Sequence, residues 1–189
     1  EAGKFVADAV APLNRDGDEI GAQWKDGAVT MPPGFKDAYR QFVEAGWGSI
    51  DGPAAYGGQD LPFTLATVII EALGSADMGF TLCNILTPGA IHALMAYGTE
   101  AQKHEWLPKL STAEVMVAVA VTEPDYGSDV ASIKTTAVAA QQDGKDGYVI
   151  NGVKTWCTFA ARANVLMLLA RTDPDRTKAH KGLSVLIVP

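Results

Sequence analysis

Cysteine and histidine are scarce in this sequence. Its 189 residues include two cysteines, Cys83 and Cys157, and three histidines. Two thiols so far apart, without a C-x-x-C pair, provide neither a disulfide framework nor a zinc site, and the histidines show no metal-ligand spacing. We therefore expect two reduced, mostly buried thiols, no metal site, and His92 as a packed residue of an apolar helix.

Basic residues are also fewer than acidic ones. The chain has 15 lysines and arginines against 22 aspartates and glutamates, which gives a formal net charge of -7. Proteins that bind nucleic acid usually present a basic surface, so a nucleic-acid partner is disfavoured. An anionic ligand would have to be held by local dipoles and a few cations rather than by the overall field.

A long uninterrupted apolar run is missing as well. The longest apolar stretch, residues 79–97, is broken by polar residues such as Asn84 and by Pro88. This pattern argues against a membrane span and favours a pair of buried helices. The chain begins at Glu1 without a visible signal peptide, and both of its ends look cut, so we expect a piece of a larger bacterial protein of the cytoplasm.

Helical periodicity dominates the first 110 residues. Apolar residues recur every three or four positions over residues 35–46 and 65–73, as expected for amphipathic helices. Thr99 and Gln102 have the spacing of a capping box, which predicts a helix that begins directly after Thr99. The 48% hydrophobic content is sufficient for a sizeable core.

Strand-like patterns replace the helical ones after residue 112. The turn cluster at residues 143–147 predicts a hairpin between the segments on either side of it. The short segments that we expect to be strands are residues 115–121, 133–138, 148–150, 154–159, 165–170 and 183–188. We therefore predict an α+β fold, with an all-helical domain over residues 1–112 and an antiparallel, barrel-like β-domain over residues 113–189.

The first motif, residues 121–129, follows an apolar strand and reads VTEPDYGSD. Thr122 offers a hydroxyl and an N–H at the strand end, and Pro124 stiffens the turn. Gly127 allows a close approach of the backbone, so that Ser128 can present its hydroxyl beside free N–H groups. Such a loop can cradle a phosphate or a carbonyl oxygen. An ordinary rigid turn explains the same residues.

The second motif, residues 154–158, reads KTWCT. Alternation along a strand would place Trp156 and Thr158 on the same face. An indole beside a hydroxyl can pack against a planar heterocycle and bond to its edge. Taken alone, this segment is equally typical of a core tryptophan with a neighbouring strand threonine.

Together, the two motifs resemble the acyl-CoA dehydrogenase family, which carries T-E-P-x-x-G-S-D followed by K-x-W-x-T. Further similarities are spread over most of the chain, at residues 56–58 (YGG), 97–103 (YGTEAQK), 106–108 (WLP), 151–154 (NGVK) and 181–184 (KGLS). In one departure, the family often has an aromatic residue three positions before the threonine, where this chain has Val119.

The resemblance implies an N-terminal helical domain, a middle β-domain and a C-terminal helical bundle that this chain lacks, with FAD between the β-domain and the helices. The implied cofactor-binding residues are Val121, Thr122, Gly127, Ser128, Trp156, Cys157 and Thr158. The first two would contact the flavin ring through their backbone and the Thr122 side chain. The glycine and Ser128 would line the pyrophosphate, and Ser128 also the thioester end of the acyl-CoA. Trp156 and Thr158 would flank the isoalloxazine, and the cysteine would contribute backbone.

The family dehydrogenates acyl-CoA thioesters. A glutamate removes the α-proton, and the β-hydrogen passes to the flavin as hydride. That glutamate lies in the C-terminal bundle, so we expect the base beyond residue 189, assign no catalytic residue here, and expect this piece alone to be inactive. The implied partners are the acyl-CoA, an electron-transfer flavoprotein and further copies of the chain in a homodimer or homotetramer.

The branch and the chemistry leave alternatives. Residues 10–47 resemble the methylmercaptopropionyl-CoA or longer-chain branch, whereas residues 155–174 resemble branches acting on small branched acyl groups such as methylsuccinyl-CoA. A flavin oxidase or monooxygenase of the same fold, and a non-catalytic module that binds flavin or acyl-CoA, are the alternative functions. The agent that reoxidises the flavin separates a dehydrogenase from an oxidase.

Overall fold

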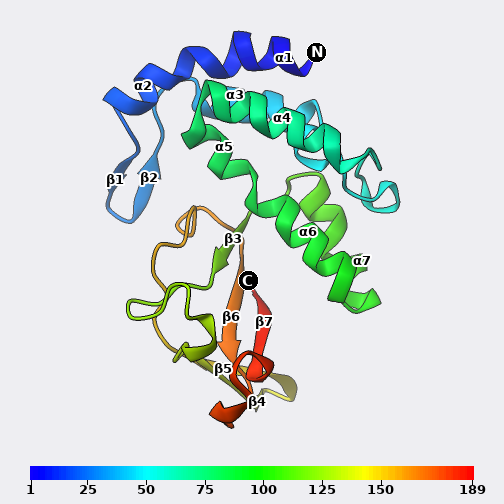
Figure 1. Cartoon of the computed structure of the whole chain (residues 1–189), viewed down its shortest axis with the longest axis vertical. Helices are drawn as coiled ribbons and strands as arrows, with labels where there is room; N and C mark the ends of the chain where they lie inside the picture. The colour runs from blue at the N-terminus through cyan, green and yellow to red at the C-terminus, as the bar shows by residue number, and fades with distance from the viewer. The chain divides into compact units, whose positions relative to one another are not determined.

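The computed structural model describes residues 1–189, which divide into two compact units, Glu1–Val117 and Ala118–Pro189. The first unit is almost entirely helical and is coloured blue to green in Figure 1. In chain order it contains α1 (Ala2–Phe5), a π-helical turn (Val6–Val10), a 3₁₀ turn (Ala11–Leu13), α2 (Asn14–Glu19), β1 (Gln23–Lys25), β2 (Ala28–Thr30), α3 (Phe35–Glu44), two 3₁₀ turns (Trp47–Ser49 and Ala54–Tyr56), α4 (Phe63–Ala76), α5 (Met78–Asn84), α6 (Leu86–Tyr97) and α7 (Glu100–Ser111). The predicted helical region is therefore confirmed, apart from one small hairpin.

That hairpin consists of β1 and β2, which pair antiparallel. It turns at Asp26 and Gly27, whose φ angles are 50° and 79°. Two successive positive φ angles fit the two-residue turn that matches the twist of adjacent strands, and an Asp-Gly pair is suited to it. The strands were not predicted because three residues are too few to display a period of two.

The core of the helical unit is centred on α3. Spacing by three and four brings Phe35, Ala38 and Phe42 to one side of this helix, where they pack with Leu73 of α4 and Phe80 of α5. The rings of Phe42 and Phe80 meet edge to face, with 6.1 Å between their centroids. Aromatic pairs prefer this arrangement because the positive edge of one ring faces the negative face of the other.

The predicted capping box of α7 is confirmed: the Gln102 N–H donates to Thr99 Oγ1 over 3.3 Å, and the Thr99 N–H donates to Gln102 Oε1 over 2.9 Å.

The prediction that His92 is a packed core residue is wrong. Its side chain is 48% exposed, and its Nε2 lies 2.8 Å from Asp51 Oδ2, so an ion pair or hydrogen bond satisfies the ring at the surface.

The segment Met78–Tyr97 is long and apolar enough to cross a membrane on length and composition alone, and 33% of its most apolar window is buried within the chain. It is divided between α5 and α6, which are separated at Ile85. Core helices of folded proteins meet the same criterion, and Phe80, Ile91 and Leu94 of this segment are buried. The division agrees with the predicted pair of helices.

The second unit is built on one five-stranded sheet: β3 (Val117–Ala120), β4 (Thr136–Gln142), β5 (Lys145–Asn151), β6 (Val165–Arg171) and β7 (Leu183–Val188). The strand order is β3-β6-β4-β5, with β7 paired to β6. Figure 1 shows β6 and β7 side by side. Two 3₁₀ segments, Val130–Ser132 and Arg176–Gly182, lie between strands. The predicted hairpin is confirmed, because β4 and β5 pair antiparallel around Asp143 and Gly144, which both have positive φ.

The sheet differs from the predicted antiparallel barrel in two respects. It is open, and β4 pairs with β6 in parallel where Thr136 lies opposite Arg171. The segment expected as a strand over residues 154–159 has no strand conformation. Since this segment leaves the ladder, β5 has a sheet neighbour on one side only, and the sheet keeps an edge there.

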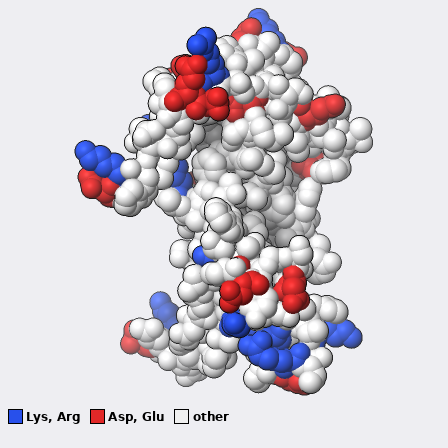
Figure 2. Space-filling view, turned by 60° about the vertical axis from the view of Figure 1, so that its left-hand side comes forward, with Lys and Arg blue, Asp and Glu red and all other residues white.

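The charges on the surface are mixed. Figure 2 shows acidic and basic side chains in small groups, separated by wide areas without charge. Binding of an anion on this face would therefore depend on local groups rather than on one broad field.

Candidate functional site

The two sequence motifs lie side by side in the second unit. The backbone N–H of Thr155 donates to the carbonyl oxygen of Thr122 over 2.9 Å. One residue earlier on each segment, Lys154 Nζ donates to the carbonyl oxygen of Val121 over 2.8 Å. The structure therefore joins the start of the first motif to the start of the second motif directly.

The first motif turns tightly after β3. Glu123 and Tyr126 exchange backbone hydrogen bonds of 3.0 and 3.1 Å, which close a turn with Pro124 at its second position. Proline favours this position because its ring presets the required φ. Val121 and Thr122 are half-buried before the turn, whereas Gly127 and Ser128 are exposed after it. No hydrogen bond connects Gly127 or Ser128 to the second motif, so these two belong to the outer part of the loop.

The second motif bends sharply instead of continuing as a strand. Trp156 and Phe159 have φ angles of 56° and 63°. A bulky residue in this left-handed region costs on the order of 1–3 kcal/mol and persists only where its surroundings enforce it. The expected alternation of Trp156 and Thr158 along a pleated strand is therefore wrong. Their orientation comes from the bend.

The bend leaves the indole of Trp156 exposed to solvent. The residue is 88% exposed within the chain, so the interpretation as a core tryptophan is wrong. Thr158 is also exposed. Cys157 is half-buried: its Sγ lies 3.6 Å from the carbonyl oxygen of Thr155, and its side chain packs against the apolar cluster of the sheet. Cys83 and Cys157 both stay free thiols.

A buried ion pair lies behind the bend. Lys154 Nζ lies 3.0 Å from Glu123 Oε1, and the two side chains are 9% and 5% exposed. Charged side chains this deeply buried are rare unless they are paired, because removal of a charge from water is costly. The pair links the turn of the first motif to the first residue of the second.

Glu123 also holds the approach to β4. Its Oε2 accepts the backbone N–H of Lys134 over 2.7 Å, and its Oε1 accepts that of Thr135 over 2.9 Å. Burial alone would raise the pKa of the Glu123 carboxyl. Hydrogen bonding from Thr135, from the Lys134 N–H and from Lys154 outweighs burial and lowers this pKa to about 2. Glu123 is therefore ionised and fully engaged at neutral pH, which does not suit a general base.

Sequence reasoning assigned no role to Glu123 or Lys154. The available signal was the presence of opposite charges within the two motifs, each directly beside an apolar or β-branched residue. Which charge meets which is long-range information, and local patterns do not contain it.

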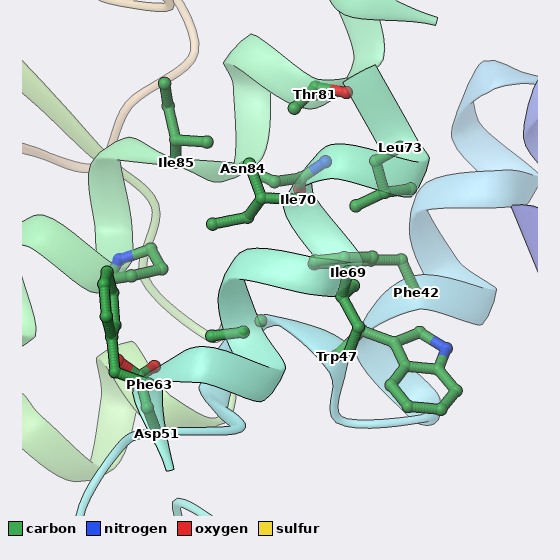
Figure 3. Close-up of a pocket in the computed structure, with 13 residues that line it drawn as sticks. Phe42, Trp47, Asp51, Phe63, Ile69, Ile70, Leu73, Thr81, Asn84 and Ile85 are labelled. Atoms are coloured by element: carbon green, nitrogen blue, oxygen red, sulfur yellow. The ribbon is translucent and has the colours of Figure 1, made fainter. Parts of the chain in front are cut away.

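The helical unit has a pocket of its own, separate from this site (Figure 3). Figure 3 shows Phe42, Ile69 and Leu73 gathered on one side of it and Phe63 with Asp51 on the other. The lining is mostly apolar and includes residues of the helical core. We interpret this pocket as a packing gap beside the core rather than as a site with chemistry.

The comparisons with known proteins cover the whole chain. Residues 1–114 match the family model described as the N-terminal domain of acyl-CoA dehydrogenase, and residues 118–189 match the one described as its middle domain. A curated relative, 3-methylmercaptopropionyl-CoA dehydrogenase of Ruegeria pomeroyi, is 41% identical over 100% of this chain and 32% of its own length. The chain thus spans about a third of that relative.

Solved structures agree with this match. The glutaryl-CoA complex of glutaryl-coenzyme A dehydrogenase aligns with a TM-score of 0.80 and 28% identity, over 99% of this chain and 44% of that one. The FAD complex of PigA aligns with a TM-score of 0.79 and 25% identity, over 99% of this chain and 45% of that one.

Proposed function

The chain belongs to the acyl-CoA dehydrogenase family, and we propose that the protein it is part of is an FAD-dependent dehydrogenase of acyl-CoA thioesters. The observation that supports this most is the direct joining of the two motifs, which leaves an exposed indole and an exposed hydroxyl, those of Trp156 and Thr158, on the second one. A planar heterocycle with polar edges fits such a surface, since aromatic rings supply contact area and hydroxyls fix orientation.

The free hydroxyls fit the cofactor. Those of Thr122, Ser128 and Thr158 make no hydrogen bond within the chain, so each is available to a ligand. FAD, when bound, accepts the hydride that leaves the substrate. In this proposal Val121 and Thr122 hold the ring edge, Trp156 and Thr158 flank the ring, and Cys157 contributes backbone. Gly127 and Ser128 line the pyrophosphate, and Ser128 also approaches the acyl thioester.

The base that removes the α-proton is assigned to no residue of this chain. Glu123 is buried against Lys154 and accepts two backbone N–H groups, so it is not free to take a proton from a substrate. We place the catalytic glutamate beyond residue 189, and this chain alone is expected to be inactive because a positioned base contributes about 10²–10⁴ in rate.

In this proposal the helical domain spans residues 1–112 and the β-domain, barrel-like in the whole protein, spans residues 113–189. The partners are the acyl-CoA, an electron-transfer flavoprotein and further copies in a homodimer or homotetramer, in the bacterial cytoplasm. Acyl groups of the methylmercaptopropionyl or methylsuccinyl kind are the first substrates to test.

The test is anaerobic mixing of the full-length holoprotein with a panel of acyl-CoA thioesters, followed by flavin absorbance. Bleaching, with reoxidation by an electron-transfer flavoprotein, is the expected result. Fast reoxidation by oxygen would instead indicate an oxidase or monooxygenase, and bound flavin that no acyl-CoA bleaches would indicate a binding module. Thr158→Val should lower the bleaching rate about tenfold. Thr30→Val, at another exposed threonine, on β2, serves as the matched control.

A further inference from the structure

We propose that Glu123 and Lys154 are positioning residues of the cofactor site: the buried pair fixes the bend that presents Trp156 and Thr158 beside the first motif. This inference rests on the proposed function. It concerns two residues that touch no reacting atom and act through their neighbours.

Lys154 is linked to the first motif by two bonds from a single atom. Its Nζ donates to the carbonyl oxygen of Val121 over 2.8 Å and pairs with Glu123 Oε1 over 3.0 Å. The next residue, Thr155, bonds to Thr122 through its backbone. Three contacts in two residues define the direction of the chain as it enters the bend at Trp156.

Glu123 extends the same connection to β4. Its carboxylate accepts the N–H groups of Lys134 and Thr135, just before β4 begins at Thr136. One carboxylate therefore joins the first motif, the start of β4 and the second motif. Displacement of any of the three would displace the others.

Thr135, whose N–H donates to Glu123, also packs against the chain just before the second motif. A Cβ atom built on Gly152 would lie 2.2 Å from Thr135 Oγ1, so the backbone at Gly152 is packed directly against Thr135. Residues 152–155 are thus held at one end by Thr135 and at the other by the bonds of Lys154 and Thr155 to the first motif. This explains how the left-handed conformation of Trp156 is enforced in a segment without strand pairing.

A buried ion pair contributes little net stability. The cost of desolvating two charges roughly offsets their attraction, and apolar replacements of similar size are often as stable. The geometric specificity of the pair, rather than its energy, is the property that such a replacement would lose. A test can therefore separate the two roles.

The experiment uses the full-length holoprotein, from which FAD is removed and then titrated back. Three variants are compared with the wild type: Lys154→Met, the charge-free double variant Glu123→Gln with Lys154→Met, and the control Lys134→Met. Lys134 lies beside the same carboxylate, but its side chain is 62% exposed and pairs with Asp125 at the surface. The measurements are the FAD dissociation constant, the melting temperature of the apoprotein and the visible circular dichroism of the bound flavin.

We expect Lys134→Met to bind FAD within about twofold of the wild type. Lys154→Met should lose both FAD affinity and melting temperature, since it leaves Glu123 buried without a cation. The double variant should recover part of the melting temperature, because no charge is left unpaired but a glutamine has one acceptor oxygen for the two backbone N–H groups. It should bind FAD about tenfold more weakly and with altered flavin dichroism, because nothing anchors the carbonyl oxygen of Val121.

The outcomes separate the inference from the proposed function. A double variant with wild-type FAD affinity and dichroism overturns the positioning role. A double variant that fails to fold also overturns it, because the pair then serves folding alone. A wild-type protein that binds no FAD overturns the proposed function itself, together with this inference.

Discussion

Lys154 Nζ contacts Glu123 Oε1 across 3.0 Å, although 30 residues separate the two positions in the chain and almost no water reaches either side chain. Each charge lowers the free-energy cost of burying the other, because an unpaired buried charge is far more costly than a paired one. The stability of the unit should therefore depend on the protonation of Glu123.

Acid should destabilise the protein through this carboxyl. Burial acts to raise the pKa of Glu123, but hydrogen bonds lower it from 4.5 to about 2 in the folded state. A carboxyl with a lowered folded-state pKa stabilises the fold above its unfolded value and loses that contribution as pH falls towards the folded value. We expect a loss of about 3 kcal/mol between pH 4.5 and pH 2, measured by urea unfolding of the full-length protein.

The control for this prediction is Glu123→Gln. It should be less stable at pH 7 and should show a shallower dependence of the unfolding free energy on pH in the same window. The same slope in both proteins would mean that other carboxyls cause the acid sensitivity.

Trp156→Asn should raise the stability of the protein and lower its affinity for FAD. Asparagine tolerates the left-handed conformation better than tryptophan does. Because the backbone strain at φ 56° is then smaller, the unfolding free energy should rise by about 1 kcal/mol. Removal of the exposed indole should weaken FAD binding. Trp24→Asn is the matched control, since Trp24 is 72% exposed on a strand and has no such strain to relieve. A loss of stability at position 156 would contradict the prediction.

Thr99→Ala should cost the helical unit about 1 kcal/mol of unfolding free energy. The substitution removes the hydroxyl that accepts the Gln102 N–H and leaves that N–H without its partner at the start of α7. Thr67→Ala provides the comparison. Thr67 bonds back to the Phe63 carbonyl within α4, and its loss should be neutral or slightly stabilising. Denaturant unfolding of both variants gives the two values.

Two glycines should respond in opposite directions to alanine. A Cβ atom on Gly58 would lie 2.2 Å from the backbone of Gly52, so Gly58→Ala should destabilise the unit by about 3 kcal/mol as the loop is forced apart. Gly89 is exposed within α6, and beyond its own stretch of helix an added Cβ would meet nothing within 4 Å. Gly89→Ala should therefore stabilise the protein by about 0.5–1 kcal/mol. Equal effects at the two positions in thermal unfolding would refute this reasoning.

Local patterns predicted what local forces determine. The helical stripe through Phe35 and Phe42, the capping box at Thr99 and the hairpin around Asp143 each depend on residues close together in sequence, and the structure confirms them. The bend at Trp156 was missed because residues 154–159 are good strand formers. Their conformation is decided instead by bonds to the first motif, which a local period cannot show.

The same limit applies to the candidate site. The two motifs could be found by their resemblance to a family, and the structure places their first residues in contact. The residues that hold them together, Glu123 and Lys154, have no individual signature, since a glutamate and a lysine in any sequence are usually solvated. Their role becomes visible only when burial and pairing are known together.

One carboxylate that joins three separate stretches of chain also constrains how the sequence can diverge. A neutral residue at position 123 would leave the ammonium of Lys154 buried without a counter-charge, and a neutral residue at position 154 would do the same to the carboxylate. Each single step crosses a less stable intermediate, whereas the paired exchange does not. Among homologues the two positions should therefore be inherited as a unit, and a motif transplanted from one relative into another should work only when its counterpart travels with it.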